Sequence, residues 1–152
     1  MDSLSAFRNL LRSHGGLLVE ALAELDDHQA LAAPNPTAAW ITAHLHDCLG
    51  EVQALVCGKR PVENSAPLET LVWLRQVEAL ERRCLELDEA LGSITEEDLD
   101  QDPAADLEGE LDAGGPCRRD LLAGHVGHMG WHLGQLARIR KHLGLSSMPG
   151  WE

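Results

Sequence analysis

The chain has 152 residues and a formal net charge of −13, with 44% hydrophobic and 24% charged residues. These values fit one globular domain, which we place at residues 1–152. The acidic charge argues against nucleic acids and anionic membranes as partners, because both attract Lys and Arg, so a small molecule is the better expectation. No apolar run reaches the roughly 20 residues that a membrane span needs. The lack of a visible secretory signal and four scattered cysteines favour a cytoplasmic location.

Four segments carry the apolar spacing of helices. They are residues 3–29, 35–57, 65–92 and 115–143. The first contains Gly15 and Gly16, where we expect a kink or a close contact with another helix. The second opens at Asn35-Pro36, a good cap followed by a favoured first residue, and it ends at Cys57-Gly58.

The segment from 93 to 114 is acidic and long. It holds nine Asp and Glu residues and no Lys or Arg. We expect a solvated crossover there, with a lid or a partner-binding loop as the alternative. The fold prediction is therefore all-α: a four-helix bundle with a long crossover before the last helix.

Histidines on the last predicted helix suggest a metal site. His128 and His132 are four residues apart, which places them about 40° apart around the helix and about 6 Å apart along it. Two imidazoles at that spacing can reach one ion, and a hydrogen-bonded cluster of buried histidines explains the pattern equally well.

The second predicted helix favours the metal. His44 lies at the edge of its apolar face, three residues after Ile41, whereas His46 points about 200° away from His44, toward solvent. When the apolar face of that helix packs inward, only His44 of the two can therefore point into the bundle. Three inward histidines from two helices can meet in a bundle core, which is where such folds place their metal sites.

The second and fourth predicted helices contain two motifs, Trp40-x-x-x-His44 and His125-x-x-His128-x-x-x-His132-x-x-Gln135. These motifs resemble those of the DinB/YfiT-like family. The resemblance covers essentially the whole chain and implies a metal-binding four-helix bundle whose triad is His44, His128 and His132. One departure is Leu133, where many members have Arg, and this position points away from the metal stripe.

Further residues near the triad have two interpretations each. His125 is either a structural histidine, which we favour, or a fourth ligand or acid–base group. Gln135 is either a substrate or ligand-orienting contact or a satisfied internal amide. Cys48 is more often a buried small residue than a ligand. Asp47 and Glu51 are expected at the solvent-exposed edge of their helix.

Three imidazoles leave a divalent ion with an open position, which is typical of a catalytic site. Zinc and nickel are the expected metals. Relatives in the resembled superfamily include bacillithiol and mycothiol S-transferases, so a thiol-dependent transferase is the first hypothesis. A metal-dependent hydrolase is the second, and a non-catalytic metal-containing stress-response or binding protein is the third. Trp40 and Trp131 are expected in the pocket walls, and a homodimer is expected from the resemblance.

Overall fold

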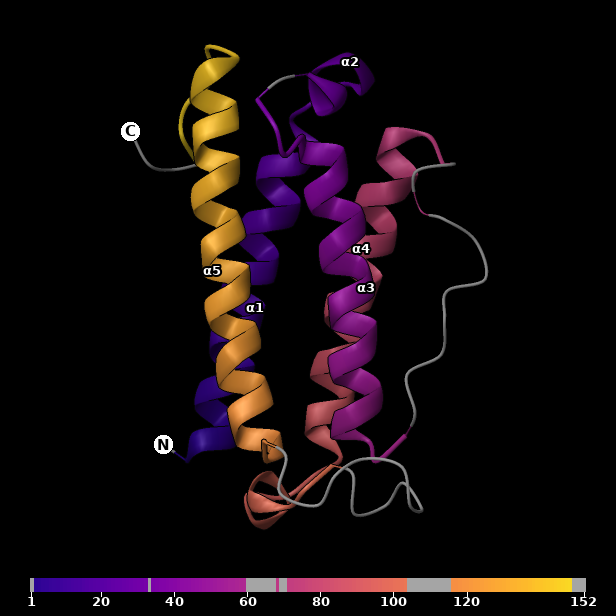
Figure 1. Ribbon diagram of the computed structural model, residues 1–152, viewed down its shortest axis with the longest axis vertical. Helices are drawn as coiled ribbons and strands as arrows, with labels where there is room; N and C mark the ends of the chain where they lie inside the picture. The colour runs from indigo at the N-terminus through magenta and orange to yellow at the C-terminus, as the bar shows by residue number, and fades with distance from the viewer. Residues whose placement is uncertain (1, 33, 60–67, 69–70, 104–115, 149–152) are drawn as a thin grey trace.

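The computed structural model describes residues 2–32, 34–59, 68, 71–103 and 116–148. Within these ranges the chain is helical and has no strand, so the all-α class is confirmed. Its elements are α1 (Ser3–Ala23), α2 (Asp27–Leu31), α3 (Ala38–Val56), α4 (Trp73–Gly92), the 3-10 helix η2 (Glu97–Asp100) and α5 (Arg118–His142) (Figure 1). None of these helices is both long and apolar enough to cross a membrane.

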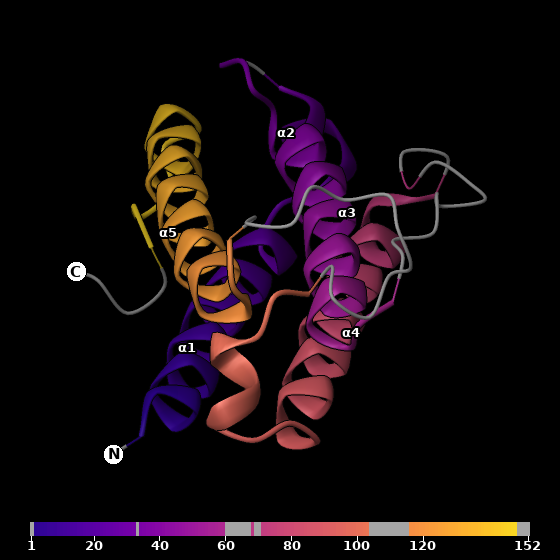
Figure 2. The same cartoon turned by 60° about the horizontal axis from the view of Figure 1, so that its bottom comes forward.

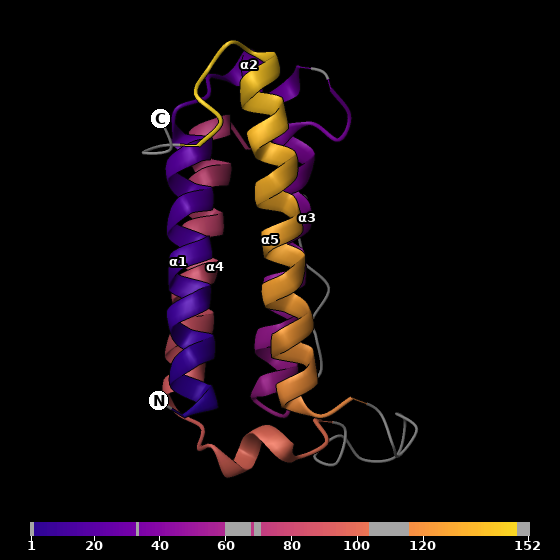
Figure 3. The same ribbon diagram turned by 90° about the vertical axis from the view of Figure 1, so that its left-hand side faces the viewer.

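The four long helices pack side by side around one apolar core. Helix α1 contacts α4 and α5, and α3 contacts the same two helices. Each long helix contributes buried leucines, such as Leu18, Leu45, Leu80 and Leu122. Seen from the side, α1 and α4 lie on one side of the molecule and α3 and α5 on the other (Figure 3).

The directions of the helices place the crossover at a different point of the chain from the one that we predicted. Helices α1 and α5 run one way, and α3 and α4 run the other way (Figure 1). Because α3 and α4 are parallel, the chain has to return along the molecule between Cys57 and Val72. Those 16 residues can reach about 50 Å, whereas α3, with 19 residues, is about 28 Å long.

The prediction of a crossover before the last helix is therefore wrong. Helix α4 ends and α5 begins at the same end of the molecule, so residues 93–117 connect neighbouring ends (Figure 1). The length of a connection in residues did not indicate the distance that it spans. Of the acidic segment, residues 104–114 lie outside the described part of the chain.

The first predicted helix is divided in the structure. Helix α1 ends at Ala23, and α2 begins after Asp26, so the expected end at Gln29 is wrong. Asp26 accepts a hydrogen bond from the Gln29 backbone nitrogen at 2.8 Å, and the Gln29 side chain accepts one from the Asp26 nitrogen at 3.1 Å. This reciprocal cap starts a new helix where the apolar spacing alone suggested continuity.

The other predicted boundaries differ mainly at the starts. Helix α3 begins at Ala38 instead of Pro36, because the Thr37 hydroxyl caps it by accepting from the Trp40 nitrogen at 3.2 Å. It ends before Cys57 and Gly58, as predicted, and Gly58 has a φ of 64°. Helix α4 starts only at Trp73 and ends at Gly92; the expected start near residues 65–67 lies outside the described residues.

The end of α5 and the glycine pair agree with the sequence. Helix α5 begins at Arg118, two to three residues after the predicted start, and ends at His142, and Gly144 follows with a φ of 77°. At Gly15, a Cβ would lie 3.1 Å from the Cys84 sulfur of α4, so this glycine provides the close helix contact that was expected. Helix α1 continues through Gly15 and Gly16.

The described part of the acidic segment packs against the end of the molecule. Helix η2 lies between the ends of α4 and α5 (Figure 2), and its Leu99 is fully buried. The Glu96 carboxylate accepts hydrogen bonds from the backbone nitrogens of Ser3 and Leu4 at 3.3 and 2.9 Å and pairs with Arg119 at 3.2 Å. Residues around η2 therefore join α1 to α5 and are not a purely solvated loop.

Candidate metal centre

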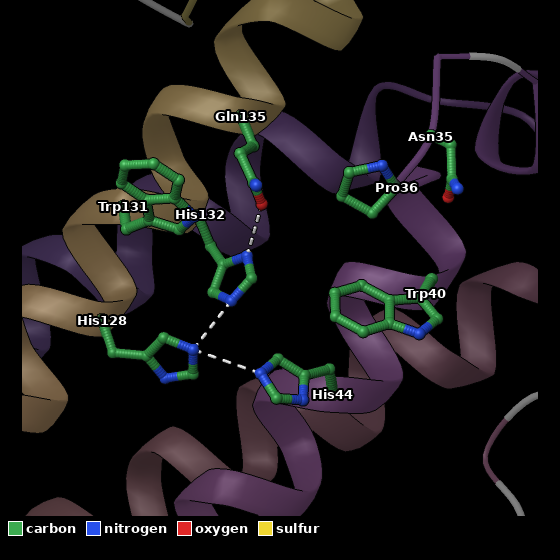
Figure 4. A pocket seen from close by; sticks show the side chains of 8 residues that line it. All are labelled: Asn35, Pro36, Trp40, His44, His128, Trp131, His132 and Gln135. Atoms are coloured by element: carbon green, nitrogen blue, oxygen red, sulfur yellow. Dashed lines mark hydrogen bonds between the residues drawn. The ribbon is translucent and has the colours of Figure 1, made fainter.

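The three predicted histidines meet between α3 and α5. The His128 Nε2 atom lies 3.1 Å from the Nε2 atom of His44 and 2.9 Å from that of His132. All three nitrogens lie within 4.8 Å of one another, so the group could hold a metal ion. Figure 4 shows the rings converging, with His44 on one helix and the other two on the facing helix.

Helix geometry explains this convergence. His128 and His132 are one turn apart on α5, so both reach the same side of that helix. His44 is fixed by its neighbours on α3, since Ile41 and Leu45 are fully buried and orient the helix face. His132 is 3% exposed, whereas His44 and His128 are partly exposed. The site therefore lies at the surface end of a contact between two helices.

The imidazoles have too few hydrogen atoms for the contacts that they make. The Gln135 amide oxygen lies 2.8 Å from His132 Nδ1 and can only accept, so Nδ1 carries the proton of a neutral ring. His132 Nε2 is then a bare acceptor facing His128. One His128 hydrogen cannot point at both His132 and His44, so at least one of the two short contacts lacks a proper hydrogen bond.

Burial keeps two of the triad imidazoles neutral. It lowers the pKa of His132 to about 4, with the neighbouring His128 as the next cause. Burial and then the charge of His44 also lower the pKa of His128 below its usual value. A neutral imidazole is the form that binds metal, so these two rings hold a lone pair ready at neutral pH.

The donor set therefore fits a divalent transition metal. If the three Nε2 atoms held one ion as bare acceptors, the shortage of hydrogen atoms described above would disappear. The His132 Nδ1–H group donating to Gln135 is the arrangement that commonly orients a metal-binding histidine. Gln135, predicted either as a contact or as an internal amide, touches the triad directly.

A pocket of about 590 Å³ opens beside the triad. Its other lining residues are Asn35, Pro36, Trp40, Trp131 and Gln135 (Figure 4). The Trp40 indole stacks on the His44 ring, with centroids 4.8 Å apart and planes 16° apart. Both expected tryptophans line this pocket.

Sequence reasoning missed Asn35 and Pro36 as pocket residues. It assigned them to the start of a helix, because Asn-Pro is a frequent way to begin one. In the structure α3 starts later, and the two residues lie in the connection from α2, beside the pocket. The sequence signal that could have corrected this was Thr37, a second good cap directly after Pro36.

His125 lies behind the triad and does not line the pocket. It is 5% exposed, and its ring centroid is 6.0 Å from that of His128. Its Nε2 atom is buried without a hydrogen-bond partner among the described residues. Burial lowers its pKa to about 4, with His128 as the next cause. This placement favours the structural role over the acid–base role.

The remaining candidates lie beside the triad or apart from it. The Cys48 sulfur is 3.7 Å from His44 Nε2, and burial followed by Glu51 raises the pKa of its thiol. His46 is outside the triad, as predicted, but its side chain is only 14% exposed and contacts Asp47 at 3.3 Å, so the expected solvent position is wrong. Asp47 and Glu51 are exposed, as expected.

Comparison of the chain with protein-family models, with curated proteins and with solved structures finds no match.

Proposed function

We propose that the chain binds one divalent transition metal ion through the Nε2 atoms of His44, His128 and His132. The observation that carries the proposal is the set of 2.9 and 3.1 Å contacts between nitrogens that have too few hydrogen atoms to satisfy them. Zinc and nickel are the proposed metals, since imidazole suits both. The helix order and motifs lead us to propose a DinB/YfiT-like four-helix bundle.

We further propose that the protein is a thiol-dependent S-transferase. A divalent ion held by three neutral ligands keeps its full charge, so when bound it would lower the pKa of a thiol placed beside it. The chain's own residues then hold the second substrate: Trp40 and Trp131 offer apolar surface, and Asn35 and Gln135 offer amide groups.

The proposed reaction is a substitution at carbon. The thiol loses its S–H bond and gives the proton to solvent, and the thiolate sulfur forms a bond to an electrophilic carbon. The leaving group departs with its electron pair. A low-molecular-weight thiol such as bacillithiol or mycothiol is the proposed cosubstrate, on the basis of the family resemblance.

Hydrolysis ranks second because none of the described residues that line the pocket is a carboxylate general base. A hydrolase needs a carboxylate or a free histidine within reach of the attacking water. Among the described residues, those that line the pocket include no Asp or Glu. Binding without turnover remains the third hypothesis. Cytoplasmic location and a homodimer stay predictions.

Metal analysis tests the site. We expect untagged wild-type protein to hold one equivalent of zinc or nickel after dialysis, and His44→Ala to hold none. His46→Ala is the matched control on the same helix and should retain the metal. Stoichiometric metal in His44→Ala would show that the triad assignment is wrong.

Turnover tests the reaction. Metal-loaded protein is incubated with bacillithiol, mycothiol, glutathione or cysteine and with chlorodinitrobenzene, and the conjugate is followed by its absorbance. Conjugation that requires metal and is lost in His132→Ala supports the transferase. No conjugation together with ester or amide cleavage would favour the hydrolase, and inactivity in both assays would favour the binding protein.

A further inference from the structure

Two tryptophans beside the triad are exposed. Trp40 on α3 is 48% exposed and Trp131 on α5 is 67% exposed, whereas Trp73 in the core is 3% exposed. Both exposed indoles line the pocket. Leaving large apolar rings in water is unfavourable, and at the mouth of a pocket it typically marks a ligand-binding surface.

The Trp40 indole is already part of a stack. Its plane lies 16° from that of His44 at a centroid distance of 4.8 Å, so one ring face is covered by the imidazole. A ligand ring can therefore extend the stack only on the other face or along an edge. Figure 4 shows Trp131 and Trp40 on opposite sides of His132, on two different helices, and both line the pocket that reaches the triad.

The polar groups of the pocket outside the triad are neutral amides, and the contact with His132 fixes the orientation of one of them. Gln135 uses its amide oxygen to accept from His132, so the amide Nε2 hydrogens are what it offers to a ligand. Asn35 is exposed and provides a second amide. Apart from the triad, no described residue that lines the pocket is ionisable.

These groups discriminate between charged ligands. Indole faces attract cations, but none of the described lining residues supplies a carboxylate that would pair with one. The ion proposed at the triad is itself positive and repels a cation. An anionic oxygen group is favoured by that ion and by the amide hydrogens of Gln135.

We infer that the pocket takes a planar, conjugated molecule that carries an anionic oxygen group, with its ring against Trp40 and Trp131 and its oxygen group at the triad. This inference rests on the proposed function, because it names the substrate class of the same metal centre. The electrophile of the transferase is then an aromatic or conjugated acid that carries a leaving group on carbon, not an aliphatic chain.

Hydroxamates of different shape test the inference. Benzohydroxamate, cyclohexanecarbohydroxamate and acetohydroxamate share one oxygen group and differ in the part that would meet the indoles. Their dissociation constants are measured on zinc-loaded protein by tryptophan fluorescence and by calorimetry. We expect benzohydroxamate to bind about tenfold more tightly than acetohydroxamate and about threefold more tightly than the cyclohexane compound, because planar stacking adds to apolar burial.

Variants identify the residues responsible. Trp131→Leu and Trp40→Leu should each weaken benzohydroxamate binding about threefold to tenfold and leave acetohydroxamate unchanged. Leu74→Ala, at a 61% exposed position on α4, is the control and should change neither. Metal content is measured for every variant, because Trp40→Leu removes the ring that stacks on His44 and a displaced His44 would appear as a loss of metal.

The outcomes separate this inference from the proposed function. Metal-dependent binding of acetohydroxamate with no preference for benzohydroxamate would overturn the inference and leave the metal centre intact. Equal binding of the benzene and cyclohexane compounds would overturn the planar class. If the protein holds no metal and no hydroxamate binds, both proposals fail together.

Discussion

Polar side chains are paired on one side of the molecule and incompletely hydrogen-bonded on the other. Between α1 and α4, the Asp88 carboxylate accepts from Arg8 at 3.0 Å and from Arg12 at 2.8 Å, so each group has a partner of opposite charge. Between α3 and α5, three imidazoles face one another and share too few hydrogen atoms. The first contact is complete within the chain, and the proposed ion would complete the second.

On our proposal, this difference separates groups that stabilise the fold from groups that bind a ligand. Partnered polar groups contribute to folding, whereas buried groups without partners cost free energy in the absence of a ligand. The α3–α5 side also carries the exposed indoles and the pocket. The α1–α4 side has a smaller groove of about 410 Å³, lined mostly by apolar residues and by the Gly15 contact.

The largest expected effect is the response to metal. Zinc at about one hundred times its dissociation constant should add about 2.7 kcal/mol to stability, which raises the Tm by about 5–10 °C for a chain of this size. His132→Ala should show no zinc-dependent rise in Tm by calorimetry. Asp88→Asn, on the other side of the molecule, should retain the full rise. A similar rise in His132→Ala would show that the zinc response does not come from the triad.

The next effect concerns Gln135. Gln135→Leu removes the acceptor that fixes the His132 tautomer, so metal affinity should fall about tenfold to one hundredfold in a competition with a chelator. Gln135→Glu keeps an acceptor and should retain most of the affinity. Equal affinities in wild type and Gln135→Leu would show that the 2.8 Å contact does not orient the ligand.

His125 should make the metal-free protein sensitive to acid. Its folded pKa is about 4, and its unfolded pKa is about 6.5. The unfolded chain therefore binds the proton first, and stability present above pH 6.5 is lost as the pH falls towards 4. Between pH 7 and pH 5, the free energy of unfolding measured in urea should therefore fall by about 1–2 kcal/mol less in His125→Leu than in the wild-type protein. The metal content of this variant should not change, and a loss of metal would instead indicate that His125 is a fourth ligand.

Asp88 should have a smaller effect on the opposite side. The hydrogen bond from Arg8 is the main cause that lowers the pKa of Asp88, so its stabilisation is complete above the usual carboxyl pKa and is lost as the pH falls through the lower folded pKa. Asp88→Asn should cost about 1 kcal/mol near pH 7, with allowance for solvent screening. The difference from wild type should shrink below about pH 4. Glu78→Gln, in an exposed pair with Arg75, is the control and should cost less.

The smallest effects come from the adjacent glycines. Nothing lies within 4 Å of a Cβ at Gly16, so Gly16→Ala should stabilise the protein by up to about 1 kcal/mol. At Gly15 the Cys84 sulfur lies 3.1 Å away, so Gly15→Ala should lose that gain and be neutral or slightly destabilising. Equal effects on urea unfolding would show that the α1–α4 contact is looser than the structure indicates.

The amino-acid sequence by itself determined the helical class, the stop of α3 near Gly58, and the three histidines that meet. These follow from local spacing, because a turn of helix places residues three and four apart on one face. The inward position of His44 and the exclusion of His46 from the triad came from the same geometry.

Only the tertiary structure decided where the helices run and what surrounds the triad. The parallel course of α3 and α4 depends on which faces pack in the core, and the length of a connection does not reveal it. Asn35 and Pro36 reach the pocket because Thr37 caps α3 in their place. The shortage of hydrogen atoms among the imidazoles arises from distances between two helices, which no local spacing encodes.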